Sequence, residues 1–169
     1  MAVRDILLYP NPQLKQVAQP VQHFDAALQA ALTDLLDTMY ACPGTVGIAA
    51  PQLAIDLRLV IVDASCARKP PDQPVHGRLV LVNPQIMEAH GEVLGREGCL
   101  SVPDYTGNVQ RAEEITVVAR DAEGDVQQYQ FAGYEARIVQ HELDHLDGIL
   151  FLDRVVSRRT DLFPRKKYR

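Results

Sequence analysis

Apolar side chains recur along residues 24–40 at the spacing of one helix face: Leu28, Leu32, Leu35, Leu36 and Met39. This period predicts an amphipathic helix with one side against a core. Asp25 lies near its start, where a carboxylate favours the N-terminal end of a helix. Pro43-Gly44 follows the last apolar position and predicts that the helix ends before it.

Shorter apolar runs predict strands over residues 57–62, 79–83, 115–120 and 126–131. Residues 67–77 contain three prolines and several charges, which is typical of a surface loop. Residues 121–124 predict a turn that joins the last two strands as a hairpin. A second helix is expected over residues 134–147, ended by Gly148. A helix, then strands, then a helix indicates an α+β fold with antiparallel strands and an N-terminal helix.

Length and charge refine this expectation. The chain has 169 residues, 47% apolar and 23% charged, a composition typical of one globular domain. The net charge is −5, yet residues 154–169 contain seven basic side chains and one acidic side chain, Asp161. We therefore expect one domain over residues 1–153 and a short basic tail of the same domain over 154–169. An acidic body argues against nucleic acid as the main ligand, while the tail could contact a polyanion.

The sequence also indicates a compartment. No apolar run approaches the roughly 20 residues that a membrane span needs, and the N-terminus does not resemble a targeting peptide. Three cysteines, Cys42, Cys66 and Cys99, are too few for a disulfide framework. We expect a cytoplasmic protein in which a special cysteine acts as a ligand or nucleophile and the others are structural.

The pattern His141-Glu142-Leu143-Asp144-His145 lies inside the second predicted helix. Two imidazoles four residues apart share one helix face and can bind one metal ion, while Glu142 can act on a water molecule as general base. The alternative is that these are polar core residues with hydrogen-bond partners. Burying them without partners or a metal would cost several kcal/mol.

A catalytic metal site generally has three protein ligands and one open position. Candidates for the third ligand are the carboxylates, the cysteines and three further histidines: His23, His76 and His90. Cys99 is favoured because Gly98 beside it permits close backbone approach, and Glu97 could accept a hydrogen bond from a ligand imidazole. A buried, inert thiol is the alternative.

A third cluster spans residues 43–52 and is rich in glycine and alanine. Gln52 at its end supplies an amide that could donate to a developing oxyanion. The alternative interpretation is a tight turn between a helix and a strand, with Gln52 on the surface.

These three segments, taken in order, resemble the three signature motifs of the peptide deformylase family. Here they are Gly47-Ile-Ala-Ala-Pro-Gln52, Glu97-Gly-Cys-Leu-Ser101 and Gln140-His-Glu-Leu-Asp-His145. The resemblance implies removal of the formyl group from the N-terminal formyl-methionine of nascent chains, with release of formate. It also implies antiparallel strands packed around a central metal-binding helix that carries the H-E-x-x-H pattern.

The resemblance further implies roles for single residues. The metal ligands would be Cys99, His141 and His145, with water as the fourth. Glu142 would move the proton, and the metal, the Leu100 N–H and the Gln52 side chain would hold the oxyanion. The methionine of the substrate would contact a pocket formed by Val46, Gly47, Tyr134, Arg137 and Ile138. The alternative interpretation is that these residues are ordinary core packing.

The family's usual ion is Fe²⁺, although a Cys/His/His set also suits Zn²⁺, Ni²⁺ or Co²⁺. Thr45 stands where many members have glycine, and Thr106 where many have an arginine that helps to hold the peptide. Arg111 is retained, and we expect it to form a structural ion pair. The basic tail could dock at the ribosome, and the alternative is a solvated tail.

Three other functions are compatible with parts of this pattern: a metallopeptidase that cleaves internal peptide bonds, an inactive deformylase-like binding protein, and a structural zinc module. Intact catalytic positions argue against the inactive homologue. The lack of a fourth ligand apart from Glu142 argues against the zinc module. We expect a monomer with no membrane association.

Overall fold

The first long helix, α1 (Ala26–Tyr40), confirms the amphipathic pattern. Asp25 is its N-cap, and its carboxylate accepts a hydrogen bond from Leu28 N at 3.0 Å. This computed structural model describes residues 3–69 and 71–165. Pro70 of the predicted loop, and Lys166, Lys167 and Arg169 of the predicted basic tail, lie outside the described residues.

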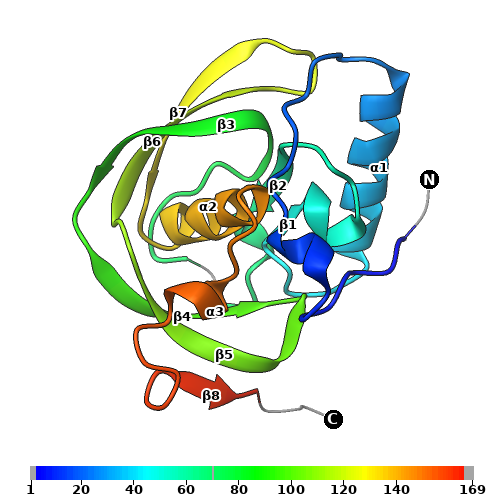
Figure 1. Cartoon of the computed structure of the whole chain (residues 1–169). Coiled ribbons are helices and arrows are strands. Elements are labelled where there is room, and N and C mark those ends of the chain that lie inside the picture. Colours follow the sequence, from blue (N-terminus) through cyan, green and yellow to red (C-terminus); the bar gives the residue numbers. More distant parts are fainter. Residues whose placement is uncertain (1–2, 70, 166–169) are drawn as a thin grey trace.

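Five antiparallel strands form the larger sheet, in the order β1-β2-β3-β6-β7 (Figure 1). They are β1 (Gly47–Ala49), β2 (Leu59–Asp63), β3 (Arg78–His90), β6 (Glu114–Arg120) and β7 (Val126–Ala132). All four predicted strands are confirmed, as is the hairpin between β6 and β7. The prediction ended β3 too early because Pro84 follows the apolar run and residues 85–90, which continue the strand, are exposed.

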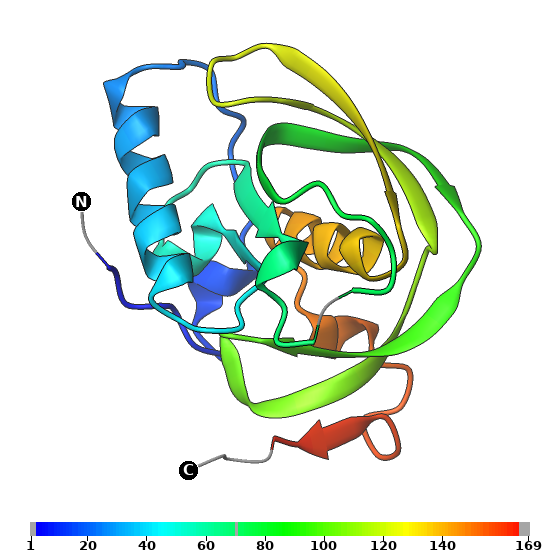
Figure 2. The ribbon, with the colours of Figure 1, turned by 180° about the vertical axis from the view of Figure 1, so that it is seen from behind.

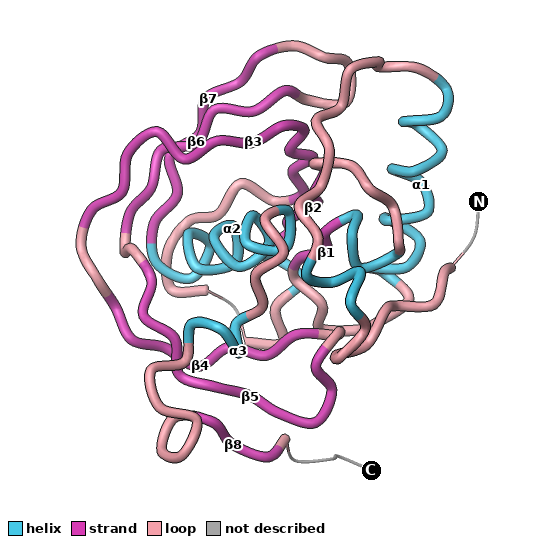
Figure 3. The backbone as a smooth tube through the Cα atoms, viewed as in Figure 1, coloured by secondary structure: helices cyan, strands magenta, loops and turns pink. Residues whose placement is uncertain are grey.

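Both faces of this sheet are buried near β2, which explains the uninterrupted apolar run there. Val60 and Val62 pack in a cluster with the second long helix, α2 (Gly133–Leu146). Leu59 and Ile61 point the other way, into a cluster with α1. Alternate residues of a strand face opposite sides, so one strand joins the two helices through two cores. Figure 3 shows α2 enclosed by strands and α1 outside them.

A smaller antiparallel sheet has the order β4-β5-β8 and was not predicted. Its strands are β4 (Val93–Cys99), β5 (Val102–Arg111) and β8 (Leu162–Pro164). The β4–β5 register shifts between Glu97 and Cys99, which places both side chains in the interior. The C-terminal strand β8 lies along the outer edge of β5, as the view from behind shows (Figure 2). Part of the expected tail is therefore a strand of this sheet.

Short elements complete the fold: the 3-10 turns η1 (Pro12–Lys15), η2 (Ala50–Leu53) and η3 (Ala64–Cys66), and the helix α3 (Phe151–Arg154). Helix α2 ends at Leu146, and Gly148 follows with φ +72°, where a Cβ would overlap with the Lys15 carbonyl. The N-terminal segment is hydrogen-bonded to the segments that contain Gln52 and Cys99: Leu7 N donates to Gln52 O, and Tyr9 N donates to Ser101 O. The mixed class with antiparallel sheets is confirmed. Within the described residues, no helix has the length and apolar character needed to cross a bilayer.

Candidate metal centre and its pocket

Helix α2 carries His141 and His145 one turn apart on the face toward the smaller sheet. Their ring centroids are 5.2 Å apart, and both side chains are buried. Cys99, at the end of β4, completes a group whose potential ligand atoms all lie within 4.8 Å of one another. The Cys99 Sγ to His145 Nε2 distance is 3.4 Å. The structure thus brings together a thiol and two imidazoles from segments more than forty residues apart.

The other candidates for a third ligand lie elsewhere. His23 and His90 are exposed, and His76 Nδ1 contacts Glu135 Oε1 at 2.7 Å. Cys42 and Cys66 are free, partly buried thiols outside this group. Among the described residues, only Cys99, His141 and His145 form a group with the composition and spacing of a metal site.

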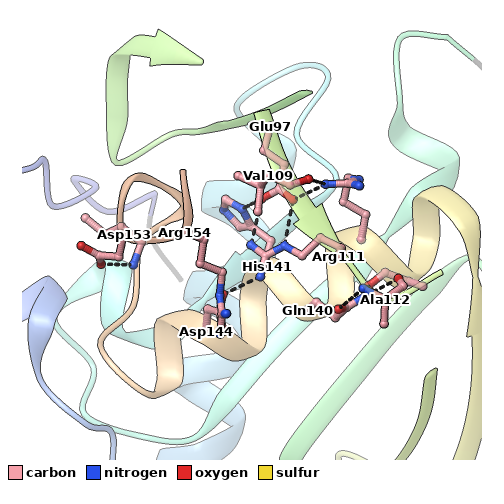
Figure 4. A network of polar contacts seen from close by, with 12 residues as sticks. Glu97, Val109, Arg111, Ala112, Gln140, His141, Asp144, Asp153 and Arg154 are labelled. Carbon is pink, nitrogen blue, oxygen red and sulfur yellow. Dashed lines mark hydrogen bonds and ion pairs between the residues drawn. The ribbon is translucent and has the colours of Figure 1, made fainter. Parts of the chain in front are cut away.

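Glu97 orients the first histidine through a buried network (Figure 4). Its Oε1 lies 2.9 Å from His141 Nδ1, and its two oxygens accept from Arg111 Nε and Nη2, each at 2.9 Å. Burial alone would raise the pKa of the Glu97 carboxyl, but hydrogen bonds from Arg111 and His141 hold its pKa well below the ordinary value of 4.5. An ionised Glu97 accepts the Nδ1 proton, which leaves His141 Nε2 available as a ligand.

Arg111 extends this network to the far side of α2. Its Nη1 donates to Asp144 Oδ2 at 2.6 Å, and Asp144 Oδ1 accepts from Arg154 Nη2 at 2.8 Å (Figure 4). Arg111 is 5% exposed, so its charge needs these two carboxylates. The expected structural ion pair of Arg111 is confirmed.

Gln52 is buried, which excludes the alternative of a surface side chain. Its Oε1 accepts from Ala49 N at 2.9 Å, which fixes the amide. Its Nε2 donates to Ser101 Oγ at 3.1 Å and lies 3.6 Å from Cys99 Sγ. The amide N–H group therefore lies directly beside the thiol, and Ser101 is a contact that the sequence reasoning missed.

Glu142 lies next to the first histidine and is 5% exposed. Among the described residues, Glu142 Oε1 has no hydrogen-bond partner, and the same is true of His145 Nδ1. Burial raises the pKa of Glu142 to about 7, although His141 lowers it. A carboxyl whose pKa is near neutrality can both accept and release a proton. An unpartnered buried carboxylate oxygen also points to a missing polar ligand.

These groups line a pocket of about 570 Å³. All the predicted site residues except His145 line it, including Leu100 directly after Cys99 and the expected substrate contacts Val46, Gly47, Tyr134, Arg137 and Ile138. His145 is 1% exposed and lies behind the pocket wall. The Arg137 guanidinium is turned away from solvent, since Nη1 donates to Glu97 Oε2 at 2.7 Å and Nη2 to Val93 O at 2.6 Å.

Gly47 lies against the carboxyl group of Glu142. A Cβ at this position would lie 2.7 Å from Glu142 Oε2 and 2.9 Å from its Cγ. Gly47 is the first residue of β1. The strand thus holds a bare backbone surface against the side chain that can move a proton.

Three arginines at the pocket were not predicted: Arg68, Arg96 and Arg165. They come from the segment after η3, from β4 and from the residue after β8. Nothing in the local sequence relates them to one another. A second cavity, of about 840 Å³, lies beside Asp144 and Arg154, and no histidine or cysteine is among its described lining residues.

The observed set fits a metal ion. A thiolate and two imidazoles are ligands of Zn²⁺ and of other divalent transition metals, and three protein ligands leave an open position. The fit extends beyond the ligands, because Glu97 orients one imidazole and an unpartnered carboxylate oxygen lies next to the group. The site can therefore hold a metal ion beside a buried carboxyl and the Gln52 amide, around one cavity.

Comparison with known proteins places this geometry in a family context. Residues 3–161 match the family model of polypeptide deformylase. A peptide deformylase of Syntrophobacter fumaroxidans is 42% identical over 166 residues, which cover 98% of this chain and 94% of that protein. One of Thermodesulfovibrio yellowstonii is 38% identical over 169 residues, covering 100% and 98%.

Solved structures agree. A peptide deformylase from Legionella pneumophila has a TM-score of 0.83 at 42% identity, covering 91% of this chain and 86% of that chain. The Met-Ala-Ser-bound class I type b peptide deformylase from Acinetobacter baumannii has a TM-score of 0.85 at 40% identity, covering 91% and 99%.

Proposed function

The chain belongs to the polypeptide deformylase family, and on this premise we propose how its own residues carry out the reaction. The enzyme removes the N-formyl group from nascent polypeptides. The observation that carries our proposal is the Cys/His/His group within 4.8 Å beside a buried carboxyl with an unpartnered oxygen. Cys99, His141 and His145 hold one divalent ion, which makes α2 the metal-binding helix of the fold. When bound, this ion polarises a carbonyl oxygen and lowers the pKa of water.

Glu142 moves the proton. Its carboxylate accepts a proton from a water molecule in the pocket as the oxygen of that water adds to the formyl carbon. The same carboxyl then donates the proton to the leaving nitrogen as the C–N bond breaks, which releases formate and a free amino terminus. A pKa of about 7 suits both steps.

Gln52 and Leu100 stabilise the negative charge that develops on the formyl oxygen. Gln52 is pre-set for this role, because its Oε1 is held by Ala49 N while its Nε2 lies beside Cys99. The Leu100 N–H follows directly after the same cysteine. Fixed donors of this kind need no reorganisation as charge develops.

The methionine side chain occupies the apolar part of the pocket. Val46 and Ile138 supply apolar wall, and Tyr134 and the stem of Arg137 line the same cavity. Gly47 presents bare backbone to the substrate. A formamide carries only hydrogen on its carbonyl carbon, so a narrow site beside the ligand group selects it over larger acyl groups.

We propose Fe²⁺ as the ion, with Zn²⁺, Ni²⁺ and Co²⁺ as substitutes, because a thiolate with two imidazoles accepts all four. Metal analysis of enzyme purified without oxygen tests this. Anaerobic handling is needed because thiolate and ferrous ion both react with oxygen species.

We further propose a cytoplasmic monomer with one catalytic domain over residues 1–153 and a basic tail over 154–169 that contacts the ribosome. Deleting the tail would remove β8, so charge substitutions are the cleaner test. Arg158→Gln with Arg159→Gln changes two exposed side chains. Salt-sensitive co-sedimentation with ribosomes should weaken in this double variant, and unchanged co-sedimentation would contradict the docking proposal.

The decisive experiment measures formate release from formyl-Met-Ala-Ser, with the metal content read on the same sample. We expect formate release from the formyl peptide by the wild type. With acetyl-Met-Ala-Ser we expect neither acetate nor a free amino terminus, both of which an enzyme with a wider acyl site would produce. Glu142→Gln should retain the metal and lose release, because the amide cannot carry the proton. Equal activity of Glu142→Gln and wild type would refute the role of Glu142.

A further inference from the structure

Three arginine side chains surround the mouth of the pocket, and we term Arg68, Arg96 and Arg165 the cationic rim. Arg68 and Arg96 are exposed, while Arg165 is half-buried. Figure 2 shows that β8 runs along β5 and that the chain passes close to α2 after η3. The rim is therefore assembled from parts of the chain that are distant in sequence.

The charges of the rim are not neutralised by the described part of the protein. Arg96 donates to Asn108 Oδ1 at 3.1 Å and to Thr106 Oγ1 at 3.3 Å, and its guanidinium lies 3.7 Å from the centroid of the Phe163 ring. All three partners are uncharged. Within residues 3–69 and 71–165, no carboxylate forms an ion pair with Arg68, Arg96 or Arg165.

The inner part of the pocket differs in this respect. Glu97 is paired with Arg111 and Arg137, and Asp144 with Arg111, so two buried carboxylates balance these two buried arginines. Uncompensated positive charge is thus concentrated at the mouth. The protein as a whole has a net charge of −5, so this local excess is not an average property of its surface.

Two glycines allow the side chains of Arg68 and Arg165 to pack directly against the backbone of the pocket. A Cβ on Gly44 would lie 2.7 Å from Arg68 Nε, and a Cβ on Gly98 would overlap with the Arg165 guanidinium. Gly98 does not have a positive φ, so its backbone conformation does not require glycine. The missing side chain instead allows the Arg165 guanidinium to pack closely against it. Seated side chains lose less conformational entropy when they bind a ligand than free surface arginines do.

Carboxylates match this chemistry. The planar guanidinium of arginine binds a carboxylate through two parallel N–H donors, and it keeps its charge at every physiological pH. In the proposed reaction the formyl group lies at the Cys/His/His group, so the residues after methionine leave through the mouth. They pass the rim on the way out.

We propose that the cationic rim makes this enzyme prefer formylated peptides with an aspartate or glutamate side chain at the second or third position. This specificity rests on the proposed function of the same site. Arg68 and Arg165 are the specificity-determining residues in this view. Arg96 is more firmly tied to the smaller sheet and supports the local positive potential.

The test compares formyl-Met-Ala-Ser-amide with peptides in which Glu, Gln or Lys occupies the second or the third position. All peptides are amidated so that the side chain is the only added carboxylate. We expect kcat/KM for the preferred Glu peptide to exceed that for its Gln counterpart by roughly tenfold at low salt, mainly through KM, and the ratio to shrink as salt is added. Lys should be worse than Gln.

Arg68→Gln and Arg165→Gln should each lower kcat/KM for the Glu peptide more than for the Gln peptide, so that the Glu-to-Gln ratio falls to roughly twofold. Arg159→Gln is the matched control, because it removes an exposed arginine from the same C-terminal segment outside the pocket. It should keep the full ratio. A ratio that falls equally in the control would overturn the assignment to the rim.

The remaining outcomes also separate cleanly. Equal kcat/KM for Glu and Gln at both positions, with normal formate release, would overturn this inference and leave the deformylase function intact. A preference shown only by peptides with a free C-terminal carboxylate would overturn the claim for acidic side chains. Absence of formate release from every peptide would overturn the proposed function and this inference with it.

Discussion

Replacing Gly47 by alanine tests how closely β1 packs against Glu142, the proposed proton-transfer group. The added Cβ would lie 2.7 Å from Glu142 Oε2, 2.9 Å from Cγ and 3.0 Å from Cδ. All three distances are too short for non-bonded contact with carbon. Gly47 is paired in register with Val62 of β2, so the strand cannot easily move away, and Glu142 lies on a well-packed helix.

Relief therefore requires the Glu142 carboxyl to shift by about 0.5–1 Å or to change rotamer. A displacement of this size at a reacting group costs on the order of 10²-fold in rate. Overpacking of a filled site costs about 1–3 kcal/mol in the free energy of unfolding. After a stability loss of this size nearly all of the protein is still folded. Gly47→Ala should therefore lose far more activity than unfolding alone would explain.

The assay is kcat/KM for formate release together with metal content and the melting temperature. Gly77→Ala is the matched control: its Cβ meets nothing within 4 Å, but its φ of +78° strains alanine. We expect the control to lose about 1–2 kcal/mol of stability and to keep its activity. Gly47→Ala with activity within twofold of wild type and bound metal would refute the placement of Glu142 as the proton-transfer group.

Three further predictions address the ligand group and stability. Cys99→Ser should sharply lower the bound metal measured after dialysis, because a hydroxyl is a far weaker ligand than a thiolate; retention of one metal per chain would contradict its ligand role. Glu97→Gln should weaken metal affinity by about 10–100-fold, because His141 loses its carboxylate partner; a chelator competition that gives the wild-type affinity would count against this. Burial raises the pKa of Asp63, but hydrogen bonds from Ser65 and Tyr40 outweigh it and place the pKa below the ordinary value of 3.8. This depressed pKa stabilises the fold above pH 3.8, and the stabilisation is lost as the pH falls through the folded-state pKa. Urea unfolding should therefore show that Asp63→Asn is less stable than the wild type at pH 7 and that the difference shrinks at acid pH. A stability difference that does not depend on pH would refute the linkage.

Local patterns were sufficient for the elements whose signal is contained in neighbouring residues. The α1 stripe, the hairpin between β6 and β7, and the helix α2 with its glycine stop all appear in the structure as the sequence predicted. Each depends on periodicity, a turn or a cap within one segment. The smaller sheet lacked such a signal, because side-chain polarity does not follow burial there: Val93 and Leu94 of β4 are exposed, while Glu97 of β4 is buried.

The site divides in the same way. The motif order in the sequence indicated the family, and the spacing of His141 and His145 followed from the helix period. That Cys99 joins them was one of several possibilities until the register shift in β4 placed its thiol 3.4 Å from His145. The buried amide of Gln52 was likewise decided by contacts with Ala49 and Ser101.

What the sequence alone determined is the chemistry available: two imidazoles one turn apart, a carboxyl beside them, and small residues that allow close approach. Only the tertiary structure decided which of these side chains contact one another. The Glu97–Arg111–Asp144 network and the cationic rim join β4, β5, α2 and the C-terminal strand, and none of these pairs is close in sequence. Their proximity comes from burial of apolar faces that lie elsewhere in the chain. Periodicity shows which face of an element is buried, but not which other element covers it.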